Sequence, residues 1–263
     1  MRLGFIGAGN MAQAMIGGIL AKEIVKKEDI IASAATQKTI DKVAKEFGIN
    51  VTLDNREVAK ADIVFLAVKP FYYEEVIDGI KDVVDEKQLI ISVAAGKSVE
   101  WVENAFGGKK KIVRIMPNTP ALVGEAVTAI CPNANITDSE KQEIVELIAS
   151  FGLAQIVSEK IMDAVIAVSG SSPAYVFMFI EAMADAAVAD GMPRPQAYKF
   201  AAQAVMGSAK MVLETGKHPG ELKDMVCSPA GTTIEAVQVL EERGFRSAII
   251  EAMRVCAEKS RNM

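Results

Sequence analysis

The stretch RLGFIGAGNMAQAMIGGIL, residues 2–20, decides the fold. An apolar run of strand length opens it, and residues of helical period follow after a glycine-rich turn. Gly7, Gly9 and Ala12 form the pattern G-x-G-x-x-A, which is typical of a strand–turn–helix that binds a dinucleotide pyrophosphate. There the first glycine permits the tight turn, the second lets the backbone approach the phosphates, and the alanine lets helix and strand pack closely. We therefore expect a dinucleotide-binding unit at this end of the chain.

Strand and helix signals alternate beyond that unit. Apolar runs of strand length occur at 2–6, 29–34, 62–68, 89–94, 111–116, 126–131 and 154–158. Stretches of helical period lie at 10–22, 38–47, 72–81, 98–106 and 138–151. Continuous apolar strands that alternate with helices imply a parallel sheet covered on both faces. We expect an α/β fold whose N-terminal Rossmann-type domain occupies residues 1–159.

The remaining sequence, residues 160–263, predicts an all-α dimerisation domain. Long Ala- and Met-rich helices are expected at 160–190, 193–216, 219–226 and 231–260. Apolar side chains of residues 173–189 spread over most of the helix circumference, which is too much for a solvated monomer. A second chain packed there would bury the excess. The alternative is a compact helical domain buried within one chain.

Composition excludes several classes of protein. The 263 residues carry a formal net charge of −5, which argues against a nucleic-acid binder. Apolar runs are interrupted before membrane-spanning length, so we expect no membrane partner. The spacing of Cys131, Cys227 and Cys256 fits no zinc or redox motif, and we see no signal segment. Free thiols, no metal and a cytoplasmic location are the expectation.

The end of the second strand favours NADP over NAD. An NAD site usually has an Asp or Glu there to bind the ribose hydroxyls. The sequence reads IASAATQKTID at 31–41, with no carboxylate at positions 33–38. Ser33, Thr36, Gln37 and Lys38 would instead donate to a 2′-phosphate. NADPH is thus the preferred cofactor and NADH the alternative, since no arginine supports the choice.

Three further loops follow predicted strands. They are FLAVKP (65–70), VAAG (93–96) and RIMPNTPALVGEA (114–126). Ligands bind at the carboxyl ends of strands in such sheets, so Lys69, Asn118 and Thr119 are candidates for cofactor contact. Ordinary turn chemistry is the alternative for each loop.

The acid–base inventory is short and points to an electrophilic substrate. The one histidine, His218, lies in an expected helix–helix loop, and SGSSPAYVF (169–177) contains no lysine. Oxidation of an alcohol needs a general base, and none is evident. A protonated imine needs only to be held in position for hydride transfer.

The stretch VCSPAGTTIEAVQVLEE, residues 226–242, predicts a helix that begins in an anion site. Amides at 230–233, the helix dipole and the hydroxyls of Ser228, Thr232 and Thr233 all offer hydrogen bonds to an anion. A helix cap explains one hydroxyl but not three. The expected substrate is therefore an imine that carries a carboxylate.

At this point the sequence resembles a known family. LKDMVCSPAGTTIEAVQVLEE (222–242) is similar to the signature of pyrroline-5-carboxylate reductases. The preceding sequence, from GFIGAGNMAQAM to HPGELKD, contains blocks similar to the family's other blocks, in the same order. The resemblance covers residues 1 to about 256. It implies reduction of Δ1-pyrroline-5-carboxylate to L-proline with NAD(P)H, the final step of proline biosynthesis. It also implies a homodimer, with a decamer of five dimers as the larger assembly.

The resemblance assigns residues by position. The cofactor-binding set comprises Gly7, Ala8, Gly9, Asn10, Met11, Ala12, Ser33, Thr36, Asn55, Ala67, Val68, Lys69, Pro70, Ala95 and Asn118. The substrate-binding set comprises Ser228, Ala230, Gly231, Thr232, Thr233 and Glu159. Thr233 is similar to the threonine that bonds the substrate nitrogen and is the catalytic candidate. Met225 stands where some members have an asparagine that reaches the partner's cofactor, so that contact is not expected. Ala230 stands where many members have glycine.

Two alternatives remain open from the sequence. One is a related NADP-dependent cyclic-imine or β-hydroxyacid reductase, although the missing lysine argues against the hydroxyacid branch. The other is a non-catalytic NADP-sensing dimer, which would explain the glycine-rich turn but not the helix start at 228–233.

Overall fold

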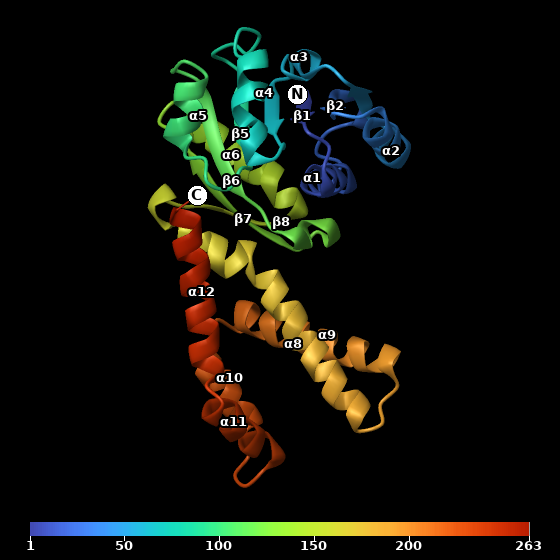
Figure 1. Cartoon of the computed structure of the whole chain (residues 1–263), viewed down its shortest axis with the longest axis vertical. Helices are drawn as coiled ribbons and strands as arrows, with labels where there is room; N and C mark the ends of the chain where they lie inside the picture. The colour runs from blue at the N-terminus through green and yellow to red at the C-terminus, as the bar shows by residue number, and fades with distance from the viewer. Residues whose placement is uncertain (263) are drawn as a thin grey trace. The chain divides into compact units, whose positions relative to one another are not determined.

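A computed structural model describes residues 1–262, and these fall into two compact units (Figure 1). One unit comprises Met1–Ser171 together with the C-terminal residues from Cys256 onward. The other comprises Ser172–Val255. These are units of packing, and the domain boundary expected at residue 159 stays a prediction.

The first unit is built on one eight-stranded sheet with the order β3-β2-β1-β4-β5-β6-β7-β8. The strands are β1 (Leu3–Ile6), β2 (Ile30–Ser33), β3 (Asn50–Thr52), β4 (Ile63–Leu66), β5 (Leu89–Ser92), β6 (Lys111–Met116), β7 (Ala126–Pro132) and β8 (Gly152–Ile156). All neighbours pair in parallel except β6 and β7, which are antiparallel. The predicted Rossmann-type sheet is confirmed, with the last two strands, β7 and β8, running opposite to the other six.

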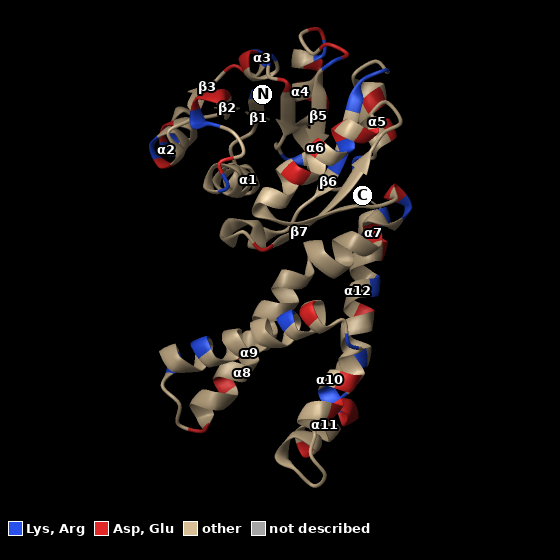
Figure 2. Ribbon diagram, turned by 180° about the vertical axis from the view of Figure 1, so that it is seen from behind, with Lys and Arg blue, Asp and Glu red and all other residues tan. Residues whose placement is uncertain are grey.

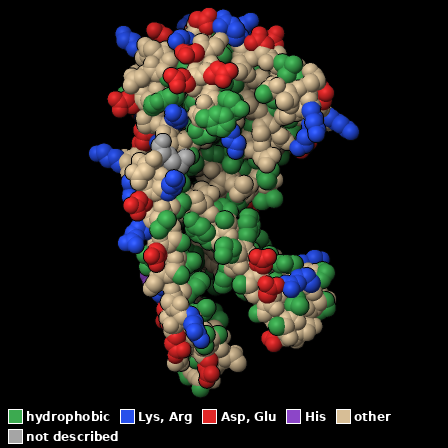
Figure 3. Space-filling view, viewed as in Figure 1, with side chains coloured by type: hydrophobic (Ala, Val, Ile, Leu, Met, Phe, Trp, Pro, Cys, Tyr) green, Lys and Arg blue, Asp and Glu red, His purple; other side chains and the backbone are tan. Residues whose placement is uncertain are grey.

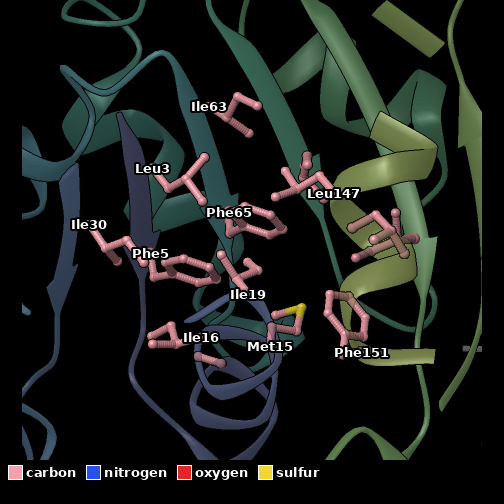
Figure 4. Packing of buried hydrophobic residues seen from close by; sticks show 14 of the residues in the cluster. Leu3, Phe5, Met15, Ile16, Ile19, Ile30, Ile63, Phe65, Leu147 and Phe151 are labelled. Atoms are coloured by element: carbon pink, nitrogen blue, oxygen red, sulfur yellow. The ribbon is translucent and has the colours of Figure 1, made fainter. Parts of the chain in front are cut away.

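Helices cover both faces of this sheet. They are α1 (Asn10–Ala21), α2 (Gln37–Phe47), α3 (Asn55–Val58), α4 (Tyr73–Ile80), α5 (Val99–Ala105), α6 (Asp138–Ile148) and α7 (Met162–Val165). One core cluster joins the sheet to α1 and α6, where Phe5 and Phe65 stack with ring centroids 4.3 Å apart (Figure 4). A second cluster packs α3, α4 and α5 on the other face. Burial on both faces is why these strands are continuous apolar runs.

Local sequence sets where these helices begin. Thr137 and Glu140 form a capping box at the start of α6, as their spacing indicates. The Thr36 side chain accepts from the amide of Thr39 and caps α2, which ends at Gly48 in the left-handed conformation. The helices therefore start and stop close to the residues that the sequence predicts.

The second unit is entirely helical in the residues described. It contains α8 (Ser172–Ala189), α9 (Arg194–Thr215), α10 (Pro219–Val226), α11 (Thr232–Glu242) and most of α12 (Phe245–Arg261). Two expectations about helix length were wrong. A π-helical turn at Ile166–Gly170 interrupts the helix predicted over 160–190. Gly244, with φ of 73°, separates α11 from α12 in the stretch predicted as one helix.

The helical unit leaves large apolar side chains exposed. Examples along α8 and α9 are Phe177, Met178, Phe200, Met206 and Leu213, the last at 79% exposure. Hydrophobic side chains are visible over these helices in Figure 3, and Figure 2 shows few charges on α8 and α9. The single chain therefore does not form the self-contained helical core that was the alternative to a dimer.

One stretch among residues 1–262, Glu159–Ala189, is long and apolar enough to cross a membrane by length and composition. Glu181 and Asp185 interrupt it, which is why no membrane span is expected from the sequence. A lone helix of this kind is weak evidence for a membrane span, because soluble proteins contain helices that pass the same test.

Candidate active site

The turn between β1 and α1 offers open amides and open space. Gly9 is the N-cap residue of α1, and no side chain of residues 1–262 caps this helix. A Cβ added to Gly9 would meet no described atom within 4 Å. The first amides of a helix lack intrahelical partners, and the helix dipole favours an anion there. The turn therefore fits the pyrophosphate of a dinucleotide cofactor.

Gly7 is required for a different reason. Its φ is 98°, a conformation that favours glycine, and a Cβ there would lie 2.7 Å from the carbonyl oxygen of Ala67. Gly7 thus lets β1 turn tightly against the end of β4. The two glycines divide the tasks that the sequence pattern assigned to them.

A pocket of about 410 Å³ lies beside this turn, entirely within the first unit. Seven residues of the predicted cofactor set line it: Gly7, Ala8, Gly9, Asn55, Ala67, Val68 and Lys69. Seven lining residues were not predicted: Ala34, Ala35, Thr39, Leu53, Tyr72, Glu75 and Val76. These come from the ends of β2 and β3, the first turn of α2, and the 3₁₀ turn and first residues of α4, which only the fold brings together.

The adenosine end predicted from Ser33 and Thr36 is arranged differently. Ser33 is fully buried, and its hydroxyl donates to the side-chain oxygen of Asn55 at 2.7 Å. Thr36 caps α2, and its hydroxyl lies 2.9 Å from that of Thr39, which lines the pocket. The sequence signal for Thr39 was its place one helical turn after the cap. Ser33 therefore supports Asn55 from behind, and Thr36 is an exposed neighbour of Thr39 at the edge of the pocket.

Asn118 also has a supporting contact. Its side chain is buried, donates to the carbonyl oxygen of Ser169 at 3.0 Å and accepts from the amide of Val127 at 3.0 Å. Pro70 begins the 3₁₀ turn Pro70–Tyr72, and Ala95 lies in the turn after β5. In the part of the chain described, the pocket lining excludes Asn10, Met11, Ala12, Ser33, Thr36, Pro70, Ala95 and Asn118. Direct cofactor contacts by these eight residues stay predictions.

A separate candidate site is the start of α11, in the helical unit. Gly231 is its N-cap residue, and no described side chain caps it. The amide of Gly231 already donates to the carbonyl oxygen of Ser228 at 3.0 Å, which closes the turn before the helix. The amides of Thr232 and Thr233 therefore remain as the helix-start donors for an anion. Ser228 and Thr232 are exposed, and Thr233 is half-buried.

Ala230 occupies a strained position in that turn. Its φ is 56°, the left-handed region, where a side chain carries a steric cost of about 1–2 kcal/mol. Many members of the family that the sequence resembles have glycine at this position. The backbone shows why glycine suits this position.

Glu159 lies in the first unit, away from α11 in sequence, and its carboxylate is already engaged. One carboxylate oxygen accepts from Arg114 Nη1 at 2.8 Å and from the amide of Val99 at 2.9 Å. Val99 is the first residue of α5, so the ion pair joins β6, α5 and the turn at Glu159–Ile161. Its role at the substrate stays a prediction.

Other titratable groups have structural contacts. His218 accepts from the amide of Gly220 at 3.0 Å and caps α10, which is a structural task. Among residues 1–262 no cluster of His, Cys, Asp and Glu is arranged to hold a metal. Burial raises the pKa of Cys131 to about 11, and its thiol donates to the carbonyl oxygen of Val157. The described cysteines are all free.

Family models match both parts of the chain. Residues 159–263 match the family described as pyrroline-5-carboxylate reductase dimerisation. Residues 2–96 match the family described as NADP oxidoreductase coenzyme F420-dependent. The first match covers the helices with exposed apolar faces, and the second covers the glycine-rich turn.

Full-length relatives agree with these matches. The chain is 52% identical over 263 residues to the pyrroline-5-carboxylate reductase of Escherichia coli (strain K12), covering all of this chain and 98% of that protein. It is 43% identical to the enzyme of the same name from Methanosarcina acetivorans, covering all of this chain and 97% of that protein.

Solved structures extend the similarity to the fold. A pyrroline-5-carboxylate reductase from Coxiella burnetii superposes with a TM-score of 0.91 at 34% identity, covering 99% of this chain and 97% of that one. A Plasmodium falciparum pyrroline carboxylate reductase with NADP bound gives 0.90 at 34% identity, with the same coverage. From sequence motifs, both candidate sites and these full-length similarities, the chain belongs to the pyrroline-5-carboxylate reductase family.

Proposed function

We propose that this chain reduces Δ1-pyrroline-5-carboxylate to L-proline by hydride transfer from NAD(P)H, the final step of proline biosynthesis. The observation that carries the proposal is the unobstructed, uncapped start of α1 beside the 410 Å³ pocket, in a chain matched end to end by reductases of this name. Open amides and room above Gly9 fit a dinucleotide.

The cofactor site is assigned to residues of the first unit. Amides at the start of α1 hold the pyrophosphate, Asn55 meets the adenosine side, and Val68 with Lys69 lines the nicotinamide side. A bound nicotinamide cofactor supplies the hydride. NADPH is the preferred form, because no carboxylate follows β2 and the Thr36–Thr39 hydroxyl pair offers hydrogen bonds to a 2′-phosphate.

The substrate site is assigned to the start of α11. The amides of Thr232 and Thr233, with the hydroxyl of Ser228, bind the substrate carboxylate. The hydroxyl of Thr233 hydrogen-bonds the ring nitrogen and orients the C=N bond. Hydride adds to the imine carbon, its electron pair forms the new C–H bond, and the C=N π electrons move to nitrogen. The iminium proton, acquired from solvent, stays on the product amine, so no protein base is needed.

The assembly proposed is a homodimer that covers the apolar faces of α8 and α9, with a decamer of five dimers as the larger form. The exposed Phe177, Phe200 and Leu213 support a protein–protein interface on these helices. Its location is cytoplasmic, with neither nucleic acid nor membrane as a partner. Light scattering of the purified chain in detergent-free buffer tests this: a monomer, or a protein that needs detergent, would contradict it.

The two alternatives are not favoured. A β-hydroxyacid reductase would need a lysine near the start of α8, and this chain has none there. An NADP-sensing dimer would leave the donor-rich start of α11 unexplained. A comparison of pyrroline-5-carboxylate with pyrroline-2-carboxylate, following loss of NADPH absorbance, separates the imine reductases. Oxidation of NADPH by pyrroline-5-carboxylate is the expected result, and no oxidation by either imine would contradict catalysis.

Thr233→Ala tests the site assignment. We expect turnover to fall by about 10²–10³-fold, as when one transition-state hydrogen bond is removed. Thr215→Ala, at the end of α9, is the matched control because it deletes a hydroxyl with only local bonds, donated to the Met211 carbonyl oxygen and accepted from the Lys217 amide. Equal rates for Thr233→Ala and the wild-type chain would remove Thr233 from the mechanism.

A further inference from the structure

The phenol of Tyr73 is buried at the start of α4 with its hydrogen-bonding capacity filled. Its hydroxyl donates to the carbonyl oxygen of Leu66 at 2.5 Å. The same oxygen accepts from the Ser92 hydroxyl at 3.2 Å and from the amide of Val93 at 3.1 Å. One donated and two accepted bonds are all that a phenol can make.

These partners lie at the carboxyl ends of two neighbouring strands. Leu66 ends β4 and Ser92 ends β5, and the two are paired in register. Beyond them the ladder weakens, since the amide of Val93 lies 3.4 Å from the carbonyl oxygen of Leu66. The phenol oxygen bonds both groups at shorter distances. Tyr73 thus holds the two strands together where their own pairing ends.

The chain that leaves this junction forms part of the cofactor pocket. Ala67, Val68 and Lys69, directly after Leu66, line it. The turn with Ala95 and Gly96 begins two residues after Val93, and Ala95 belongs to the predicted cofactor set although it does not line the pocket. A change at the junction therefore shifts the backbone that would face the nicotinamide.

A hydroxyl in the core at this point is not needed for packing. Phenylalanine would fill the same apolar space, whereas a buried hydroxyl is costly unless it is bonded. Because Leu66, whose carbonyl oxygen accepts from the Tyr73 hydroxyl, leads directly into the pocket-lining residues 67–69, we propose that Tyr73 is a positioning residue for the cofactor. It fixes the loops at 67–70 and 93–96 in their binding geometry. The inference rests on the cofactor site of the proposed function.

Tyr73→Phe tests the proposal, with NADPH affinity as the readout. Titration of the full-length protein with NADPH, without substrate, measures the dissociation constant directly. We expect it to rise by about 10-fold, with a parallel rise in the KM for NADPH, since the variant leaves the Leu66 carbonyl and the Val93 amide with only their long 3.4 Å bond to each other. Ser92→Ala removes one of the three bonds and should give a smaller rise, which keeps the proposal testable if Tyr73→Phe folds poorly.

Gln88→Met is the matched control. Gln88 immediately precedes β5, at the opposite end of the same strand, and its side chain also makes three hydrogen bonds: it donates to the carbonyl oxygens of Ala59 and Ala61 and accepts from the amide of Asp85. Gln88→Met should lower the melting temperature about as much as Tyr73→Phe does, and it should leave NADPH affinity within twofold of the wild-type value.

The outcomes separate the two proposals. An NADPH dissociation constant for Tyr73→Phe within twofold of wild type, or an equal rise in Gln88→Met, would overturn the positioning role. A wild-type chain that binds NADPH without reducing pyrroline-5-carboxylate would overturn the proposed function and leave the role of Tyr73 standing on the binding data.

Discussion

The buried hydroxyl of Ser33, at the end of β2, donates a 2.7 Å hydrogen bond to the side-chain oxygen of Asn55, the first residue of α3. Because that oxygen already accepts from Ser33, the side-chain NH₂ group of Asn55 is what the residue offers to a ligand. Asn55 lines the pocket, and Ser33 stands behind it. The pair explains how a residue outside the lining affects the adenosine side.

Ser33→Ala should therefore weaken NADPH binding through Asn55. Loss of one orienting hydrogen bond predicts a dissociation constant about fivefold higher. Ser150→Ala is a suitable control, because Ser150 is also buried and its hydroxyl donates only to the nearby carbonyl oxygen of Leu147. Fluorescence titration of both variants with NADPH gives the comparison, and equal affinities would show that Asn55 does not depend on Ser33.

Gly7→Ala and Gly9→Ala should fail in different ways. A Cβ at residue 7 would lie 2.7 Å from the Ala67 carbonyl oxygen, and the φ of 98° there is unfavourable for alanine. We therefore expect the free energy of unfolding to fall by about 2–4 kcal/mol. At residue 9 a Cβ meets only open space in the described chain, so the melting temperature should hold while NADPH affinity falls at least about 10-fold. Thermal melts with and without NADPH distinguish the two. A destabilised Gly9→Ala would contradict the ligand role of that space.

The first unit was predictable where one segment carries the whole signal. The β1–α1 turn shows this, because glycine spacing, strand and helix stand together in residues 2–20. β3, at Asn50–Thr52, escaped notice because it is short and only partly buried, so it has no apolar run. The reversed direction of β7 and β8 has no sequence signal of its own, since strand direction depends on how the chain returns to the sheet.

The site was less predictable because folding creates its neighbours. Tyr72 and Leu53 line the same pocket although they are well separated in the sequence, and no local sequence pattern predicts that they lie together. The α11 start is another example: its sequence offers the Gly231 amide as a donor, but the turn consumes it in a bond to Ser228. Local pattern reveals which groups exist, and tertiary structure determines which remain available.

Ala230→Gly should stabilise the turn before α11. Left-handed backbone costs alanine about 1–2 kcal/mol, while glycine loses about 0.5–1 kcal/mol through greater freedom in the unfolded chain. The net expectation is a gain of up to about 1 kcal/mol in the free energy of unfolding, with activity retained. Ala236→Gly, inside α11 and exposed, should instead lose about 1 kcal/mol. Denaturant unfolding measures both, and a destabilised Ala230→Gly would contradict the strain.

Tyr73 should make the protein sensitive to alkaline pH. Burial raises its pKa to about 12, against opposing effects of the Ser92 and Val93 hydrogen bonds and the Arg114 charge. The unfolded phenol ionises near its ordinary pKa of 10. The stabilisation is therefore fully present below pH 10 and is lost as pH rises from 10 to about 12, by about 2–3 kcal/mol. Denaturant unfolding across that range should show a steeper loss for wild type than for Tyr73→Phe; parallel curves would exclude this coupling.

Glu159→Gln decides between two roles for a residue that the sequence assigned to the substrate. Arg114 and Glu159 are 8% and 34% exposed, so the variant leaves a buried guanidinium without its counter-charge. We expect the free energy of unfolding to drop by about 2–3 kcal/mol, less than for a fully buried pair because Glu159 is partly hydrated. The KM for pyrroline-5-carboxylate should change less than twofold if the carboxylate serves only Arg114 and Val99.

Asp82→Asn provides the control, because Asp82 also pairs with an arginine, Arg56, but on the surface. Surface ion pairs contribute little, so its unfolding curve should stay close to that of the wild-type chain. A Glu159→Gln protein with normal stability and a KM for pyrroline-5-carboxylate raised tenfold would instead place Glu159 at the substrate. The ion pair would then be secondary to binding, and the assignment made from sequence resemblance would hold.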